Sequence, residues 1–71
     1  MVEPRLGNRL KELRAAHNLT QAELAVLAGV SRKTINTIEN GVFLPSTLIA
    51  LILARCLGAK VEELFYLTPE A

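Results

Sequence analysis

The hydrophobic residues of this 71-residue chain recur at helical spacing along most of its length. Leu6, Leu10 and Leu13 lie four and three residues apart with charged residues between them, which predicts an amphipathic helix over about residues 5–17. Apolar spacing and end-capping residues predict four more helices, over about residues 21–28, 32–40, 46–57 and 61–67. The polar–apolar alternation of a strand never lasts more than a few residues, so the pattern predicts one all-α domain of five helices.

The segment from residue 20 to residue 41 predicts two short helices joined by a tight turn. Thr20 and Glu23 have the spacing of a capping box, in which each side chain bonds the backbone amide of the other residue. Ser31 is a favoured N-cap for the following helix. Gly29 and Gly41 stand at the turn and at the second helix end, where a positive φ is easiest for glycine.

The helix predicted over residues 32–40 has an apolar side and a polar side. Ile35 and Ile38 belong to the apolar side, which we expect to pack on the preceding helix. The residues expected to point outward or to lie at the leading end are Ser31, Arg32, Lys33, Thr34, Asn36, Thr37 and Asn40. Basic residues at a helix start oppose the helix dipole, a placement that is easier to understand if an anion binds there. A helix that presents donors and positive charge in this way suits the major groove of double-stranded DNA.

Several positions in this segment share the pattern of one protein family. They are Gln21, Ala25, Gly29-Val30-Ser31, Ile35, Ile38 and Glu39-Asn40-Gly41. This pattern resembles the Cro/cI-type (XRE-type) helix-turn-helix repressor family, and the similarity extends over roughly residues 6–66. The resemblance implies a compact five-helix, lambda-repressor-like DNA-binding domain that occupies residues 1–71 and has its helix-turn-helix at about residues 20–41.

The resemblance also implies roles for single residues. Positions that match Arg32, Lys33 and Thr37 read base edges in the family. Positions that match Gln21, Thr34 and Asn40 hold phosphates. Either Arg32 or Lys33, facing O6 and N7 of guanine, would contribute about 1–3 kcal/mol of discrimination, and the residues leave open which of the two does so.

A second implied contact is an ion pair between Arg14 and Glu39. By resemblance it would tie the first helix to the end of the third, and such a pair sets helix orientation more than it adds stability. The alternative interpretation is that Arg14 is a free surface charge.

Charge and cysteine content limit the other chemistry that this chain can perform. The net charge is only +1, but residues 1–60 hold all eight Lys and Arg against four Glu, whereas residues 61–71 hold three Glu and no base. Cys56 and His17 are the chain's single cysteine and histidine, so we expect no disulfide, no metal site and no cofactor. The cysteine usage and the lack of a signal peptide predict a cytoplasmic protein. The apolar run at residues 48–54 is too short to cross a membrane.

The helix predicted over residues 46–57 is unusually apolar. Leu48 and Ile52 lie on the flank of its inward face, and Leu44 precedes them. One interpretation is additional core contact with the fifth helix. The other is a homodimer interface, whose candidate residues are Leu44, Leu48, Ile52, Phe65, Tyr66 and Leu67. A two-fold dimer would let two recognition helices read half-sites about 34 Å apart.

The leading functional hypothesis is a sequence-specific regulator of transcription, most simply a dimeric repressor on a palindromic operator. The alternative is a module that keeps the fold and binds a protein partner, which the low net charge and apolar fourth helix favour. Salt dependence separates the two, because phosphate contacts weaken steeply with salt. An enzyme is a poor third hypothesis, since no carboxylate pair, glycine-rich loop or nucleophile–base set is present.

Overall fold

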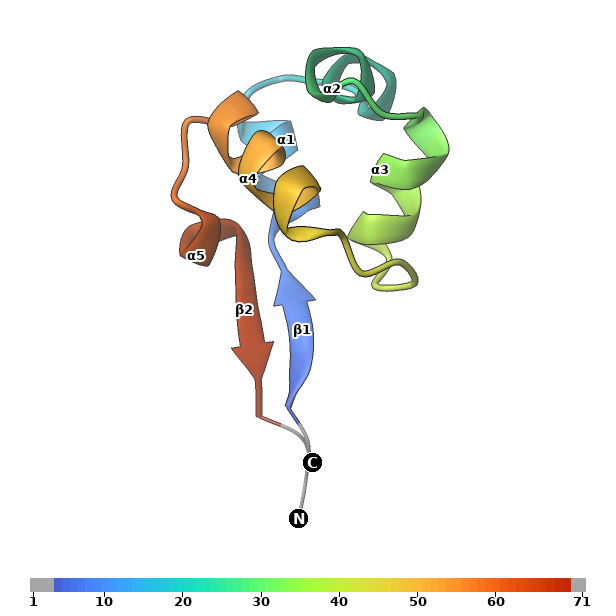
Figure 1. Ribbon diagram of the computed structural model, residues 1–71. Helices are drawn as coiled ribbons and strands as arrows, with labels where there is room; N and C mark the ends of the chain where they lie inside the picture. Colours follow the sequence, from blue (N-terminus) through green and yellow to red (C-terminus); the bar gives the residue numbers. More distant parts are fainter. Residues whose placement is uncertain (1–3, 70–71) are drawn as a thin grey trace.

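Residues 4–69 of the computed structural model form a cluster of helices from which a two-stranded ribbon projects (Figure 1). The described elements are β1 (Arg5–Asn8), α1 (Leu10–Ala16), α2 (Gln21–Ala28), α3 (Arg32–Glu39), α4 (Thr47–Cys56), α5 (Val61–Leu64) and β2 (Phe65–Thr68). The ribbon gives the molecule an elongated outline of 40 × 21 × 20 Å.

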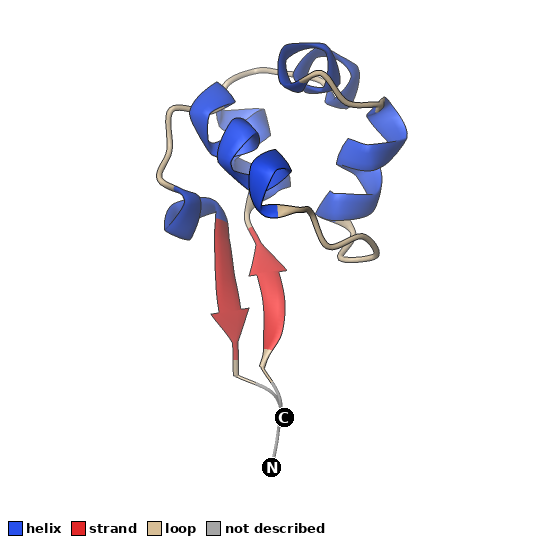
Figure 2. Cartoon of the chain, in the orientation of Figure 1, coloured by secondary structure: helices blue, strands red, loops and turns tan. Residues whose placement is uncertain are grey.

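The two strands show that the all-α prediction was wrong in part (Figure 2). β1 and β2 are antiparallel neighbours, with Leu6 opposite Leu67 and Gly7 opposite Tyr66. The first helix therefore begins at Leu10 and the fifth ends at Leu64, so that residues expected at helix ends are extended instead. Each strand has only four residues, which is too short for alternation to stand out in the sequence.

The segment from residue 20 to residue 41 forms its two helices as local sequence rules predict. The Thr20 hydroxyl oxygen accepts a hydrogen bond from the Glu23 amide at 3.0 Å, and the Glu23 carboxylate accepts one from the Thr20 amide at 2.8 Å. Gly29 has a φ of 72°, a left-handed conformation that lets the chain reverse between α2 and α3. Ser31 then caps α3 by accepting from the Thr34 amide at 3.1 Å.

One hydrophobic core joins all five helices of the described residues. It is made of the buried apolar side chains Leu10, Leu24, Ala25, Ala28, Ile35, Ile38, Leu53, Ala54, Leu57, Leu64 and Phe65. Burial of each large side chain contributes roughly 1.5–3 kcal/mol. Phe65 is only 9% exposed, so it belongs to this core, and its proposed place at a dimer interface needs correction. Ile35 and Ile38 face the core, and this orientation turns the polar side of α3 outward.

The ribbon is held to the helices by its inner end. The Arg9 amide donates to the Leu64 carbonyl at 2.9 Å, where the two strands meet α1 and α5. The Tyr66 ring packs so closely against Gly7 that a Cβ on residue 7 would come within 2.4 Å of the ring. The Arg9 guanidinium sits 5.1 Å from the centre of the same ring, within cation–π range.

Candidate nucleic-acid interface

The outward side of α3 carries a continuous row of polar side chains. Ser31, Arg32, Lys33 and Asn40 are exposed, and Thr34, Asn36 and Thr37 are half-buried. All seven lie on or next to one helix, and Gln21 lies at the start of α2, which packs against it. The structure therefore brings the DNA-binding candidates of the sequence to one side of the molecule.

Hydrogen bonds within α3 decide which groups its polar side chains present. The Thr37 hydroxyl lies 2.9 Å from the Lys33 carbonyl and 3.1 Å from the Thr34 carbonyl, so its proton is engaged with the backbone. That leaves the methyl group and oxygen lone pairs of Thr37 for a partner. Asn40 donates to the Asn36 side-chain oxygen at 3.3 Å, so the Asn36 amide group remains as a donor on this side.

A chain of polar contacts runs from α1 to the first residue of α3. Arg14 Nε donates to Glu39 Oε2 at 2.6 Å, and Gln21 Nε2 donates to Glu39 Oε1 at 3.0 Å. Arg32 Nη1 in turn donates to Gln21 Oε1 at 3.3 Å. These hydrogen bonds orient the Arg32 guanidinium, because Gln21 is itself held by the Glu39 carboxylate.

The centre of this series of polar contacts is the Arg14–Glu39 ion pair that the family resemblance implied. The side chains of Arg14 and Glu39 are 14% and 3% exposed, and Arg14 also donates to the Leu19 carbonyl at 2.7 Å. Glu39 is the sole acidic residue of α3, and its charge is matched by Arg14. Arg32 and Lys33 therefore dominate the charge of the outward side.

The acidic residues of α5 lie away from this side. Glu62 and Glu63 belong to α5, which Figure 1 shows on the opposite side of α4 from α3. The small net charge of the chain thus hides a local positive region at the start of α3.

A shallow hollow beside α3 adds two residues that the sequence analysis missed. It has a volume of about 300 Å³ and is lined by Ser31, Lys33, Thr34, Thr37, Val42 and Phe43. Val42 and Phe43 are exposed although both are apolar. The signal that could have identified them is an apolar pair directly after Gly41, in a turn where polar residues are usual.

An apolar surface covers one side of α4 and of the turn before it. Leu48 is 68% exposed and Leu51 is 52% exposed, and Leu44 is similarly open to solvent. Leu48 and Leu51 are three residues apart on one side of α4, Leu44 lies in the turn before the helix, and no residue from 41 to 54 is charged. The exposure of Leu48 does not fit the interpretation that it adds core contact, whereas Ile52 is half-buried against the core. Leu51 was not among the interface candidates.

This apolar surface continues onto the ribbon. Leu6 and Leu67 are opposite each other on the two strands, and both are exposed. A groove of about 270 Å³ between the ribbon and α4 is lined by Leu6, Pro45, Thr47, Ala50, Leu51, Val61 and Phe65. Tyr66, another interface candidate, is 39% exposed and packs on Gly7 and Arg9.

Comparison with known proteins identifies the family. The profile of the helix-turn-helix family matches residues 10–64. The chain belongs to this family. The relatives confirm the resemblance to XRE-type regulators, and the chain is a transcriptional regulator with a helix-turn-helix DNA-binding domain.

Individual relatives and solved structures agree with this assignment. An uncharacterized HTH-type transcriptional regulator of Methanocaldococcus jannaschii, MJ0272, is 50% identical over 60 residues, which are 84% of this chain and 91% of that protein. Another from Archaeoglobus fulgidus is 45% identical over 65 residues, or 92% of each chain. The crystal structure of the restriction-modification controller protein C.AhdI from Aeromonas hydrophila has a TM-score of 0.74 and 38% identity, and covers 78% of this chain and 83% of its own.

Residues 4–69 contain neither a candidate metal site nor a membrane-spanning helix. In this part of the chain, no group of three or more His, Cys, Asp and Glu side chains could hold a metal ion. None of its helices has the length and apolar character needed to cross a membrane.

Proposed function

We propose that this protein is a sequence-specific repressor that binds double-stranded DNA as a homodimer, with α3 in the major groove. The observation that carries the proposal is that α3 is buried on one side only, so that its isoleucines enter the core while its polar residues face solvent. A role without catalysis and a cytoplasmic location are part of the same proposal.

Within α3 we assign the principal base contact to Arg32. Its guanidinium is oriented by Gln21, and its fork of donors matches O6 and N7 of guanine. Lys33 is exposed beside it and suits a phosphate, as a point charge on a flexible stem. Thr37 offers its methyl group to a thymine methyl, and the apolar Val42 and Phe43 lie at the edge of the same hollow.

These roles predict different behaviour for two neighbouring substitutions. Arg32→Ala should lower affinity for the preferred duplex by about 10- to 100-fold and relax preference at one base pair, because a bidentate contact is lost. Lys33→Ala should weaken binding to all duplexes alike and reduce the salt dependence by about one phosphate contact. Titrations of labelled duplexes at several salt concentrations measure both effects, and the opposite pattern would exchange the two assignments.

The homodimer is proposed to form through the apolar surface of α4 and the preceding turn. Leu44, Leu48 and Leu51 are its main residues, with Ile52 at the margin. Burial of each leucine contributes roughly 1.5–3 kcal/mol, so a few from each subunit suffice to hold a dimer. A surface without charge can pair with a copy of itself without repulsion between like charges.

Leu48→Glu tests this interface without disturbing the core, since Leu48 is exposed. Sedimentation should show a dimer for the wild type and a monomer for the variant. Val26→Glu is the matched control, because it introduces the same charge at an exposed apolar position on α2. A monomeric wild type, or an unchanged mass of Leu48→Glu, would exclude the interface.

The function itself is tested by selecting bound duplexes from a random pool at physiological salt and sequencing them. A palindrome with half-sites about one helical turn apart, near 34 Å, is the expected result. A single unrepeated site would support DNA reading by a monomer and contradict the dimer.

The exposed leucines of α4 favour one alternative, a module that binds a protein partner. Contact through apolar surface should weaken little with salt, whereas DNA contact through several phosphates should weaken steeply. No enrichment in the selection, together with salt-insensitive binding to a protein, would favour that alternative.

A further inference from the structure

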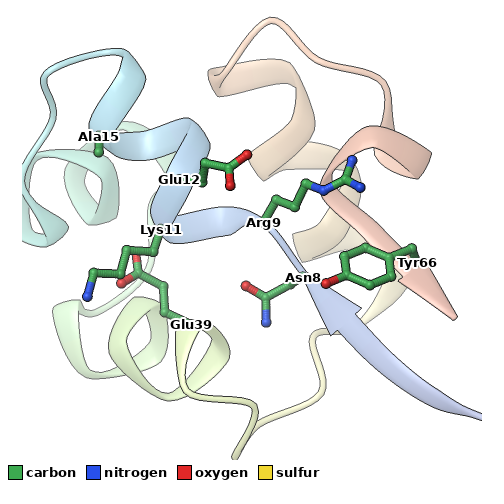
Figure 3. A pocket seen from close by; sticks show the side chains of 7 residues that line it. All are labelled: Asn8, Arg9, Lys11, Glu12, Ala15, Glu39 and Tyr66. Atoms are coloured by element: carbon green, nitrogen blue, oxygen red, sulfur yellow. The ribbon is translucent and has the colours of Figure 1, made fainter. Parts of the chain in front are cut away.

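Asn8 joins three elements at the inner end of the ribbon. It is the last residue of β1, and its side chain reaches the last turn of α3, where Nδ2 donates to the Ile38 carbonyl at 3.0 Å. Its Oδ1 accepts from the Leu10 amide at 3.1 Å, at the start of α1. Figure 3 shows Asn8 between Tyr66 of the ribbon and the end of α3 that carries Glu39. A half-buried side chain thus uses its donor and its acceptor on two different helices.

The contact with Ile38 reaches the backbone of α3. The Ile38 carbonyl is one of the last carbonyls of the helix, which have no partner further along it. It accepts from the Gly41 amide at 3.0 Å and from Asn8, so both of its lone pairs are used. Arg14 and Gln21 also hold the end of α3, but through the Glu39 side chain, whose torsions leave more freedom to the helix axis.

We infer that Asn8 is a positioning residue for DNA reading, which sets the angle of α3 relative to α1 and the ribbon. This inference rests on the proposed function, since it needs α3 to be the element that reads DNA. Arg32 is six residues from Ile38, about 9 Å along a helix that rises 1.5 Å per residue. A tilt of about 10° over that length displaces one end by about 1.6 Å, which exceeds the roughly 0.5 Å that a preorganised site tolerates.

The ribbon gains a functional role from this contact. Its strands come from the two ends of the chain, and Asn8 pairs with Phe65 across them. Correct pairing of β1 with β2 places Asn8 where it can reach Ile38. The terminal segments therefore help to orient the recognition helix.

Two substitutions remove the contact with Ile38 and keep an acceptor for Leu10. Asn8→Asp has the same shape but no donor toward a carbonyl. Asn8→Ser is uncharged, and its hydroxyl oxygen can still accept from the Leu10 amide, but its side chain is too short to reach α3. Because only the aspartate adds a negative charge, agreement between the two variants excludes repulsion of DNA as the cause.

The matched control is Ser46→Ala, which removes one hydrogen bond of similar length, from the Ile49 amide to the Ser46 hydroxyl oxygen at 3.1 Å. That bond caps α4 and does not touch α3. The full chain is used, at a temperature where circular dichroism shows each variant to be folded. Affinity is measured for the selected duplex and for a scrambled duplex at two salt concentrations.

Both Asn8 variants should bind the selected duplex about tenfold more weakly, which is the effect of losing much of one base contact. Binding to the scrambled duplex should change less than about twofold, because phosphate contacts tolerate a tilted helix. The ratio of the two affinities should therefore fall in both variants and stay unchanged in Ser46→Ala. A purely structural role would lower both affinities together.

Three results overturn the inference. The first is an unchanged ratio in both folded variants, and the second is an equal fall of the ratio in Ser46→Ala. The third is a wild-type chain that prefers no duplex, and there the proposed function fails as well. When the wild type selects a duplex and the Asn8 variants bind it equally well, the positioning role fails alone.

Discussion

Replacement of Glu39 by alanine should destabilise the fold strongly. Glu39 accepts from Arg14 Nε, Arg14 Nη2 and Gln21 Nε2, and its side chain is only 3% exposed. Breaking a buried pair by removing one partner costs about 3–5 kcal/mol, mostly because the other charge stays buried without compensation. Arg14 is 14% exposed and keeps its bond to the Leu19 carbonyl, so we expect a loss of about 2–4 kcal/mol.

That loss is large for a domain of this size. A stability of roughly 0.05–0.15 kcal/mol per residue gives about 4–11 kcal/mol for 71 residues. Urea unfolding followed by far-ultraviolet circular dichroism should show a lower midpoint with an unchanged slope.

A double substitution tests whether the loss comes from the charge of Arg14 that stays buried without a partner. Arg14→Met together with Glu39→Leu removes both charges and keeps apolar volume, so its free energy of unfolding should lie within about 1 kcal/mol of the wild type. The reasoning is refuted if Glu39→Ala costs less than about 1 kcal/mol, or if the double variant is less stable than Glu39→Ala. Either result would mean that an unpaired buried charge on Arg14 does not cause the loss of stability in Glu39→Ala.

Two further predictions concern local contacts. Hydrogen bonds from the Thr20 amide and hydroxyl lower the pKa of Glu23 below its ordinary 4.5, so the stability they contribute is complete above pH 4.5 and is lost as pH falls through the folded pKa. The stability difference between the wild type and Glu23→Gln, measured by urea unfolding, should therefore shrink on acidification, and a difference that grows would contradict this. Gly7→Ala should push the Tyr66 ring off the ribbon and away from Arg9, because a Cβ on residue 7 would lie 2.6 Å from Cζ of the ring. The lost cation–π contact should cost about 0.5–1 kcal/mol of stability. Tyrosine fluorescence and unfolding midpoints measure both effects, and an unshifted Tyr66 signal would oppose the prediction.

The sequence by itself determined the central motif of this protein. The boundaries of α2 at residues 21 and 28 and the start of α3 at Arg32 were predicted from Thr20, Gly29 and Ser31. These signals are reliable because a cap or a left-handed glycine acts on backbone groups only a few residues away. The outward row of polar residues on α3 was likewise readable, since helical spacing alone separates it from Ile35 and Ile38.

Tertiary structure decided what depends on residues distant in the sequence. β1 and β2 exist because residues 5–8 pair with residues 65–68, and neither four-residue segment is stable as a strand alone. Only the packed structure shows that Phe65 enters the core while Leu48 stays exposed, although both are large and apolar. The contact of Asn8 with Ile38 spans 30 residues, and such a contact leaves no local pattern because its partner is a backbone carbonyl that every residue carries.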